Sequence, residues 1–431
     1  MLRGHGAWTI LLTGVGALIL LTGVAFGLQS PIKPEDPCPQ GPTASKTQSK
    51  LWFNDGTWWG ILFDESTEEY HIYRYGGAKD TWSDTGTLVD GRNASRADVL
   101  WEGPHLYVVS AGTEAGLQEH GARFLRYSYD PSTERYTLDG GFPVTIAKGG
   151  SEAVSIAKDS TGKLWATYTQ GDESSPGLLR VYVTHTVGSD DSEWVEPSVP
   201  PLEGTTVDSD DVSAIVAFDS QIALMWGNQY DESGMAGYYF ATHKDGAPDD
   251  EWRSDNPVLK STMSNDHLNV KADSEGRIYA VTKTRLDRIN RDLDAPYIVL
   301  WVRDQKGDWT SHVFGKVKDS HTRSFALLDE ARRDLYMFAT SPTCSGGKIY
   351  YKSTDLDDIT FEEGRGTLFM QGANGTKIGD ATSTKQNLDE VEGALVVASS
   401  PTDGDYYYNI LDPGSEKKLS SYGARIEGAG W

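Results

Sequence analysis

Short runs of alternating hydrophobic and polar residues, separated by clusters of Gly, Asp, Ser and Pro, fill most of this 431-residue chain. Such short alternating runs predict β-strands. Aromatic residues recur at one place in this pattern, between 52 and 58 residues apart: Trp82, Tyr136, Trp194, Trp252, Trp309 and Phe361. Four strands with their turns occupy about 50 residues, which is the size of one propeller blade. The pattern therefore predicts an all-β chain of repeated four-stranded units.

We expect these units to form a single β-propeller over residues 50–431, because each unit needs its neighbours to bury its second face. Six complete units fill residues 50–370. Further strands within 382–408 would make a seventh, and its outer strand would come from 420–431 or from residues before 50. Seven blades are preferred. The alternative is six blades, with the terminal strands packed as an extra layer.

The N-terminal segment predicts a cell-surface or secreted protein. Residues 8–28 carry no charge and are strongly apolar, and about 20 such residues can span a bilayer. We expect 1–28 to be a signal anchor with the body outside, or alternatively a cleaved signal peptide. Residues 29–49 are rich in Pro, Lys, Ser and Thr and are expected to form an exposed extracellular tether. The membrane would then be contacted through the N-terminal segment only.

Cysteine and charge content narrow the possible partners. Cys38 and Cys344 would tie the tether to the propeller if they form a disulfide, which an outside location permits. The alternative is two unpaired thiols. Cys and His residues show no metal-binding spacing, so no metal or cofactor is expected. The net charge of −24 argues against nucleic acid as a partner, since phosphate binding needs a basic surface.

Two turns that precede predicted outer strands each begin with Thr-His and end with Trp, with the same number of residues between. They run from Thr184 to Trp194 and from Thr242 to Trp252. A third turn, at 353–361, repeats the theme. These turns resemble degenerate Asp-boxes, and residues 50–411 resemble secreted or surface bacterial proteins of the sialidase-like β-propeller superfamily. In that superfamily Asp-boxes are structural turns on the face opposite the site. The resemblance therefore implies the fold and assigns no chemistry to these turns.

Sialidase activity itself is not expected. The sialidase family binds a carboxylate with three arginines and uses a Tyr/Glu nucleophile pair with an acid/base Asp. The arginine that the family has near the start of the first unit is missing from 50–53, where Lys46 and Lys50 are the nearest basic residues.

The repeat also locates the propeller axis, because the innermost strand of each blade begins beside the central channel. Aligning the units places polar or charged residues near these strand starts, 56 to 62 residues apart: Arg96 with Asp98, Glu152, Asp211, His267 with Lys271, Arg323 and Lys385. We expect their side chains to converge in one axial pocket, which is the default location of a site.

The cations of this set suit a ligand that carries carboxylate or sulfate groups. Lys271, Arg323 and Lys385 belong to the fifth, sixth and seventh units, and arginine recognises such groups in a bidentate manner. Arg96 and Asn269 are further candidates for ligand binding. The predicted partner is therefore an anionic extracellular glycan.

Two kinds of catalysis fit the remaining candidates. His267 or His321 would act as general acid or base in β-elimination on a uronic acid polymer, as in some propeller-fold polysaccharide lyases. Alternatively, Asp98, Glu152 and Asp211 would supply the carboxylate pair of a glycoside hydrolase.

The sequence thus predicts an extracellular β-propeller that recognises an anionic glycan in its axial pocket, and it leaves open whether the glycan is also cleaved. The alternative is a non-catalytic surface module that binds a protein or a polysaccharide through its rim. A third interpretation is a purely structural surface protein, in which the polar residues at the strand starts pair only with one another and with water.

Overall fold

The computed structural model describes residues 40–430, apart from residues 45, 189, 235 and 422 and the segments 77–79, 114–120, 172–176, 231–233, 290–291, 343–345 and 414–420. The described residues form one compact unit. The predicted signal segment 1–28 and both cysteines, Cys38 and Cys344, lie outside the described residues, so the anchor and the disulfide stay predictions. Within the described part, no helix is long and apolar enough to cross a membrane.

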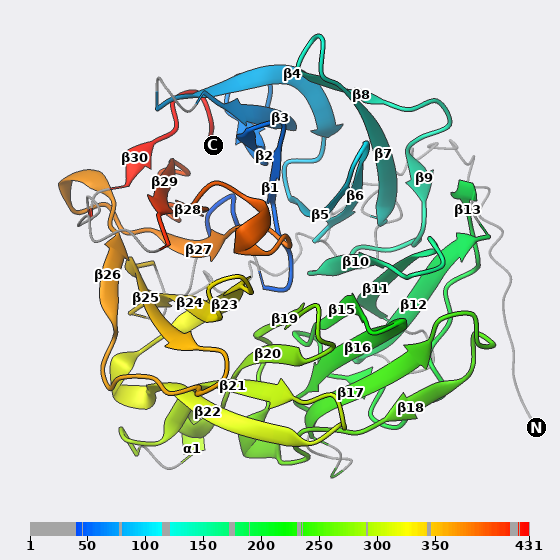
Figure 1. Cartoon of the computed structure of the whole chain (residues 1–431), viewed down its shortest axis with the longest axis vertical. Coiled ribbons are helices and arrows are strands. Elements are labelled where there is room, and N and C mark those ends of the chain that lie inside the picture. The colour runs from blue at the N-terminus through cyan, green and yellow to red at the C-terminus, as the bar shows by residue number, and fades with distance from the viewer. Residues whose placement is uncertain are drawn as a thin grey trace, which may run out of the picture. The chain divides into compact units, whose positions relative to one another are not determined.

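Seven antiparallel sheets follow one another around a common axis (Figure 1), which confirms the prediction of a seven-bladed propeller. In each blade, four strands run in sequence order from the axis outward. Blades 1 to 4 consist of β1 (Leu51–Asn54), β2 (Thr57–Asp64), β3 (Glu69–Tyr75) and β4 (Trp82–Asp90); β5 (Ser95–Glu102), β6 (His105–Gly112), β7 (Arg123–Asp130) and β8 (Arg135–Leu138); β10 (Val154–Lys158), β11 (Leu164–Gly171), β12 (Leu179–Val187) and β13 (Asp190–Trp194); β15 (Ser213–Phe218), β16 (Gln221–Asn228), β17 (Gly237–Lys244) and β18 (Trp252–Ser254).

The remaining blades have the same order. Blades 5 to 7 consist of β19 (Leu268–Ala272), β20 (Ile278–Lys283), β21 (Pro296–Arg303) and β22 (Trp309–Lys316); β23 (Thr322–Asp329), β24 (Asp334–Ser341), β25 (Lys348–Asp355) and β26 (Thr367–Met370); β27 (Gly379–Thr382), β28 (Ala394–Ser399), β29 (Tyr406–Leu411) and β30 (Ala424–Arg425). The outer strand of blade 7 therefore comes from the C-terminal tail, one of the two predicted sources.

Short elements complete the fold. Two extra strands pair with the third strands of blades 2 and 3, namely β9 (Val144–Thr145) and β14 (Thr206–Val207). The described helices are short: α1 (Leu286–Ile289) and the 3₁₀ helices η4 (Ser261–Met263), η5 (Val317–Asp319), η6 (Ala373–Gly375) and η7 (Leu388–Glu390).

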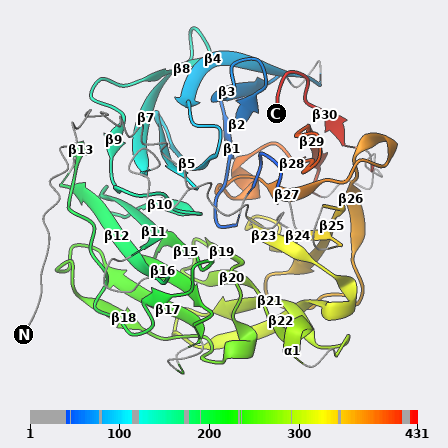
Figure 2. The same ribbon diagram turned by 180° about the vertical axis from the view of Figure 1, so that it is seen from behind.

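The first strand of every blade lines the axis, and neighbouring first strands contact one another from β1 through to β27. Figure 2 shows the same ring from behind. We call the face where these strands begin the start face, and the face where they end the end face. A side chain near the first residue of such a strand therefore lies at the start face, as the repeat predicted.

Large aromatic side chains fill the space between neighbouring blades. Trp52 and Trp59 of blade 1 meet Tyr136 of blade 2 edge-on, with ring centroids 5.5 and 5.0 Å apart. Trp309 of blade 5 packs in the same way on Phe240 of blade 4, at 5.1 Å. Aromatic pairs in this geometry add about 0.5–1.5 kcal/mol beyond the burial of their area. Tyr136 and Trp309, two of the recurring aromatics, thus serve as inter-blade packing.

The two turns that share the Thr-His to Trp spacing are also built alike. The indole Nε1 of Trp194 donates a hydrogen bond to the carbonyl of Asp191 at 3.0 Å. Trp252 donates in the same way to the carbonyl of Asp249 at 3.1 Å. Both turns therefore join a third strand to a fourth strand through the same local hydrogen bond.

Among the described residues, blades 1 and 7 have separate sheets, and one isolated β-bridge between Asp64 and Ala429 joins them. Tyr408 on β29 packs on Tyr75 and Trp82 of blade 1, with centroids 5.6 and 6.0 Å apart. The backbone N–H of Gly430 donates to the carbonyl of Phe63 at 2.8 Å. Non-covalent contacts between blades 1 and 7 thus take the place of a common strand.

Residues 40–49 run close to the axis before β1 begins (Figure 1); we call them the axial segment. Its described residues are buried, apart from the half-buried Gln40. The backbone N–H of Thr43, for example, donates to Ser399 Oγ of blade 7 at 3.0 Å. The prediction of an exposed tether over 29–49 is therefore wrong for this part, because its polar groups find partners inside the ring in place of water.

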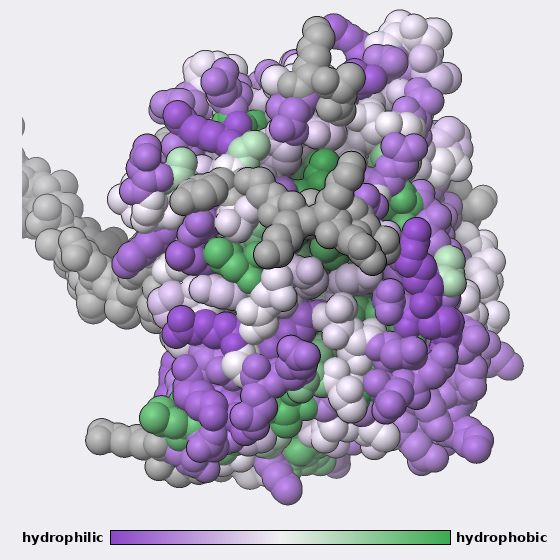
Figure 3. Space-filling view, turned by 60° about the vertical axis from the view of Figure 1, so that its left-hand side comes forward, coloured by the Kyte–Doolittle hydropathy of each residue, from purple (hydrophilic) through white to green (hydrophobic). Residues whose placement is uncertain are grey.

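The surface seen in Figure 3 is largely hydrophilic, with small and separate hydrophobic patches. Large hydrophobic side chains exposed on the described surface are few: Leu88, Leu138, Val187, Leu259, Leu293 and Val313. Scattered single residues of this kind are normal on soluble domains, so they do not indicate a docking surface.

Tyr408→Ala should weaken the closure between blades 7 and 1. We expect the free energy of unfolding to fall by about 3–5 kcal/mol, the usual cost of removing a buried aromatic ring. Tyr408→Phe keeps the ring and loses the hydrogen bond to the Asp80 carbonyl at 2.8 Å, so it should cost about 1 kcal/mol. Urea denaturation followed by tryptophan fluorescence measures both, and equal losses would contradict closure by packing.

Candidate functional site

The start face carries ionisable side chains from the strand starts of six blades. They are Arg96 in blade 2, Glu152 before blade 3, Asp210 before blade 4, Asp266 and His267 before blade 5, Arg323 in blade 6 and Asp380 in blade 7. Together with Lys46 of the axial segment, we call them the start-face cluster. Four of the predicted site residues are thus brought to one face: Arg96, Glu152, His267 and Arg323.

Lys46 connects the carboxylates of this cluster. Its Nζ lies 2.5 Å from Asp266 Oδ2, 2.9 Å from Glu152 Oε1 and 3.2 Å from Asp210 Oδ1, and its side chain is 1 % exposed. Burial opposes the charged form, but the three carboxylates outweigh it and raise the pKa of Lys46 above its ordinary value. Lys46 therefore stays charged at neutral pH and links the connections that precede blades 3, 4 and 5.

Both arginines of the cluster are already paired. Arg96 Nη1 donates to Glu152 Oε1 at 3.1 Å, and Arg96 Nη2 donates to Gln40 Oε1 at 2.5 Å. Arg323 Nε lies 3.2 Å from Asp380 Oδ1. Arg323 and Asp380 both have positive φ, 52° and 53°, which is costly for residues other than glycine. The predicted cationic pocket is therefore a network of ion pairs at this face, in which Arg323 Nη1 is buried without a hydrogen bond.

The exposure of the carboxylates differs within the cluster. Glu152 is 20 % exposed, and although burial opposes its ionisation, Lys46 and Arg96 hold its pKa below the usual range. The Asp210 side chain is 61 % exposed. Solvent therefore reaches the cluster at Asp210, and a pocket of about 690 Å³ borders Arg96 and the axial-segment residues Gln40, Gly41, Pro42 and Ala44.

His267 has a hydrogen-bonding partner on each ring nitrogen. Nδ1 lies 2.8 Å from Asp266 Oδ1 and 2.7 Å from Asn265 Oδ1, and Nε2 lies 3.2 Å from Thr322 Oγ1. Burial lowers the pKa of His267 to about 3, despite the neighbouring charge of Asp266. The imidazole is therefore neutral at physiological pH, and its nitrogens fix its orientation.

Two predicted catalytic residues do not reach the axial pocket. Asp211 is fully buried and accepts hydrogen bonds from the backbone N–H of Gln229 at 2.8 Å and from its side chain at 3.0 Å. His321 is also fully buried; its Nε2 lies 3.1 Å from the Arg365 carbonyl and its ring packs on Phe314 at 5.0 Å. The prediction that these two side chains reach the axial pocket is therefore wrong, because their hydrogen bonds hold loops in place.

Asp98 and Lys385 lie inside the channel. Asp98 is fully buried, and its Oδ1 accepts the backbone N–H of Ser49 at 2.8 Å. Its Oδ2 accepts the N–H of Ile156 at 2.9 Å and the Lys385 ammonium at 2.5 Å. Both oxygens of Asp98 thus accept hydrogen bonds from protein donors, so Asp98 ties the axial segment to blades 3 and 7.

A cavity of about 240 Å³ occupies the part of the axis toward the end face. It is lined by parts of the innermost strands, by η7 and by Thr47 and Ser49 of the axial segment. Its other aromatic and polar lining residues are Trp52, Trp101, Glu102, Ser155, Lys158, Asn269, Lys271, Thr384, Lys385, Gln386, Asn387 and Glu390. The predicted ligand-binding residues Asn269, Lys271 and Lys385 thus share this cavity, which we call the axial cavity.

The interior of the axial cavity has an excess of cationic groups. Lys271 is 6 % exposed, and its Nζ donates to the Thr384 carbonyl at 2.5 Å. Burial lowers the pKa of Lys271 to about 7; the charge of Lys385 adds to this effect and that of Asp98 opposes it. Two lysines therefore share the single carboxylate of Asp98, and that carboxylate is bonded to Lys385.

The mouth of the axial cavity is aromatic and acidic. Trp101 is half-buried beside Glu102, which ends β5, and Glu390 ends η7; both glutamates are exposed. Carboxylates accept hydrogen bonds from hydroxyl groups, and an indole ring offers an apolar face. The mouth therefore combines groups suited to a polyhydroxylated ring.

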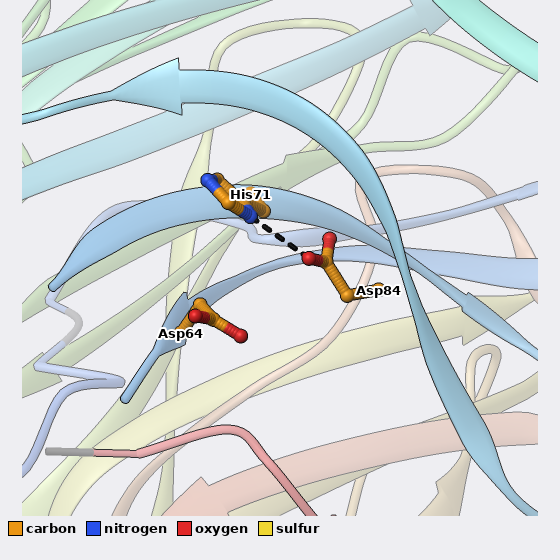
Figure 4. A group of neighbouring side chains, drawn as sticks. All are labelled: Asp64, His71 and Asp84. Carbon is orange, nitrogen blue, oxygen red and sulfur yellow. Dashed lines mark hydrogen bonds and ion pairs between the residues drawn. The ribbon is translucent and has the colours of Figure 1, made fainter. Parts of the chain in front are cut away.

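A histidine and two aspartates of blade 1 also lie together (Figure 4), with possible ligand atoms within 4.8 Å of one another. His71 Nδ1 lies 3.0 Å from Asp84 Oδ2. Asp64 Oδ1 already accepts hydrogen bonds from the backbone and hydroxyl groups of Ser66 and Thr67. The turn after β2 thus accounts for Asp64, and this group does not indicate a metal site.

Several residues of the cluster were missed from the sequence. Asp210 and Asp266 each directly precede a residue that the alignment of units selected, Asp211 and His267. These acidic neighbours could have been selected from the sequence, because the predicted start of a strand is uncertain by one or two residues. Lys46 had no such signal beyond its position as a basic residue ahead of the first unit.

No protein-family model and no curated protein matches the sequence. The solved structures that it resembles include a Penicillium chrysogenum alpha-L-arabinanase complexed with arabinobiose (13% identity, 75% of this chain and 98% of that chain, TM-score 0.45). Polysaccharide lyase Uly1 is similar over 91% of this chain and 92% of its own, at 9% identity and TM-score 0.47. A protein of unknown function from Dyadobacter fermentans DSM 18053 matches at 12% identity over 76% and 98%, with TM-score 0.42. At these identities and TM-scores the likeness carries no information on activity.

Lys46→Met should destabilise the propeller strongly. We expect the free energy of unfolding to fall by about 3–5 kcal/mol, because removing one partner leaves buried carboxylates without their cation. The matched control is Lys148→Met, since Lys148 is 80 % exposed with one ion pair at 3.4 Å to Glu196 and should change stability by less than about 1 kcal/mol. Urea denaturation compares them, and a small effect in both would contradict the role given to Lys46.

Proposed function

We propose that the protein binds a carboxylate-bearing sugar residue of a glycan in the axial cavity. The observation that supports this most directly is Lys271, which lines the cavity at 6 % exposure and has no carboxylate of its own among the described residues around it. Asp98 is bonded to Lys385. A ligand carboxylate would complete the pairing of Lys271, and hydrogen bonds between charged groups are the strong ones.

The size of the cavity favours a single sugar ring. Its volume of about 240 Å³ lies below the roughly 300–1,000 Å³ of pockets for drug-sized ligands. Trp101 would stack on the apolar face of the ring, and Glu102, Asn387 and Glu390 would exchange hydrogen bonds with its hydroxyl groups. A ligand sugar with its carboxylate at the inner end of the cavity and its hydroxyl groups at the mouth would be a uronic acid.

Binding without cleavage is the activity that we propose. The predicted acid–base residues His267 and Glu152 belong to the start-face cluster and do not line the axial cavity. Asp98 has its oxygens filled by protein donors. The proposal therefore follows the non-catalytic alternative, with the ligand on the axis in place of the rim.

The ligand would be an extracellular glycan if residues 1–28 direct the body of the protein outside, as the sequence predicts. The proposal does not depend on the sialidase-like resemblance, because the Asp-box-like turns at Trp194 and Trp252 do not line the cavity. The acidic surface of the chain, with a net charge of −24, would disfavour polyanions at long range. Specificity would thus arise inside the cavity.

Lys271→Met should weaken the binding of uronic acids. Calorimetry with D-glucuronic and D-galacturonic acid should show saturable binding to the wild-type protein by at least one of the two sugars. Loss of a charge-assisted hydrogen bond of about 1.5–3 kcal/mol corresponds to a roughly 10- to 100-fold higher Kd. Lys148→Met should bind as the wild type does. Equal binding of the neutral sugars D-glucose and D-galactose, or no effect of Lys271→Met, would contradict the proposal.

Uronic acid affinity should fall as the pH rises above about 7. Lys271, with a pKa of about 7, is charged below this pH and must take up a proton above it to pair with a carboxylate. Up to the pKa that Lys271 has in the complex, Kd should therefore rise by at most about tenfold per pH unit. Lys158, Lys385, Glu102 and Glu390 are the other titratable residues that line the cavity.

Calorimetry in buffers of different ionisation enthalpy would measure the proton uptake directly. Wild-type protein should take up close to one proton above pH 7, and the Lys271→Met variant should take up none. A Kd that does not change between about pH 6 and pH 9 would show that Lys271 does not hold the acidic group.

A further inference from the structure

We infer that the axial cavity is blind, that it accepts only the terminal residue of a glycan chain, and that Lys46 maintains this specificity from the opposite face. The inference rests on the proposed function, because it specifies which part of a glycan the cavity takes. It is carried by a different observation, the way in which the axial segment closes the channel.

The axial segment forms the floor of the cavity. Thr47 and Ser49 both line its inner end. The backbone N–H of Ser49 donates to Asp98 Oδ1 at 2.8 Å, which ties the floor to blade 2. The carbonyl of Gln48 accepts a hydrogen bond from Thr382 Oγ1 at 3.3 Å, which ties it to blade 7. The floor is therefore held on two sides of the channel.

Behind this floor lies a small void, bordered by the axial segment and by blades 5, 6 and 7. This void measures about 10 Å³ and is bounded by Lys46, Gln48, Ser49 and Arg323, among others. A single water molecule needs roughly 10–15 Å³, so this void holds at most one. A sugar ring that enters from the end face therefore cannot continue to the start face.

Anchors at the start face keep the floor in place. Lys46 Nζ lies within 3.2 Å of carboxylates from the connections before β10, β15 and β19. Thr43 Oγ1 lies 2.5 Å from Ser399 Oγ and 3.4 Å from the Gly379 carbonyl of blade 7. Opening the channel requires all of these contacts to break, and the ion pairs are the strongest of them. Lys46 is thus a positioning residue for the cavity, although it does not line it.

A blind cavity distinguishes chain ends from chain interiors by geometry. An interior residue of a glycan carries a glycosidic bond on each side, so a chain that passes through a binding site needs two exits. The axial cavity has one mouth, at the end face, and a volume of about 240 Å³ that suits one ring. Only a terminal residue can therefore enter with its carboxylate toward Lys271.

The stoichiometry of binding tests this directly. The probes are a uronic acid monosaccharide, its oligomers and a long homopolymer of the same residue, titrated into the full-length wild-type protein. The number of proteins bound per chain should stay constant as the chain grows, so that the number bound per sugar residue falls in inverse proportion to length. Binding that scales with the number of sugar residues would overturn the inference.

The failure of this inference is distinguishable from that of the proposed function. If no uronic acid monosaccharide binds, the proposed function fails and the inference fails with it. If a monosaccharide binds but the polymer binds in proportion to its residues, only the blind cavity is wrong.

Variants separate the anchor from the cavity. Lys46→Met should loosen the floor and raise the number of proteins bound per polymer chain at least twofold, while Lys148→Met should keep the wild-type stoichiometry. Thr43→Val removes only the hydroxyl contacts and serves as the milder variant if Lys46→Met does not fold, with a smaller rise expected. If a folded Lys46→Met protein still bound only at chain ends, with the same number of proteins per polymer chain as the wild type, the role given to Lys46 would be wrong.

Discussion

Lys46 brings a positive charge with 1 % exposure to within 2.5 and 2.9 Å of carboxylates from two different blade connections. Isolated charges in such surroundings are costly, and only close pairing makes their burial tolerable. Because Lys46 and its partners neutralise one another, the axial segment can pass through the centre of the ring. The arrangement along the axis follows from this interaction: the axial segment lies across the channel, with the start-face cluster on one side of it and the axial cavity on the other.

The pairing of cations with carboxylates also explains why the two ends of the axis differ in charge. At the start face, Arg96 and Arg323 are each paired with a carboxylate. Toward the end face, Lys271 and Lys385 share Asp98. Repeated blades supply similar positions at every strand start, so small differences in their residues decide where a charge remains unmatched. The proposed ligand site is thus marked by Lys271, a cation of the cavity lining that forms no ion pair with a carboxylate among the described residues.

The sequence was sufficient for the architecture, because strand alternation and the spacing of Trp82 to Phe361 depend only on local pattern and repeat length. It also indicated the convergence of Arg96, Glu152, His267 and Arg323, since equivalent strand starts must meet at one face. It did not reveal that residues 40–49 fill the axis. Their Pro, Ser, Thr and Lys content is that of a linker, and their burial depends on ion pairs with residues more than 100 positions away in the chain. The composition of a segment does not indicate ion-pair partners that are so distant in the chain.

A crystal structure of the protein with a bound uronic acid would test the account most directly. The account predicts a ligand carboxylate within hydrogen-bonding distance of Lys271 Nζ, a sugar ring beside Trp101, and Lys46 still bound to Asp266 and Glu152. A ligand on the outer rim, or one in the start-face cluster in place of Lys46, would contradict it.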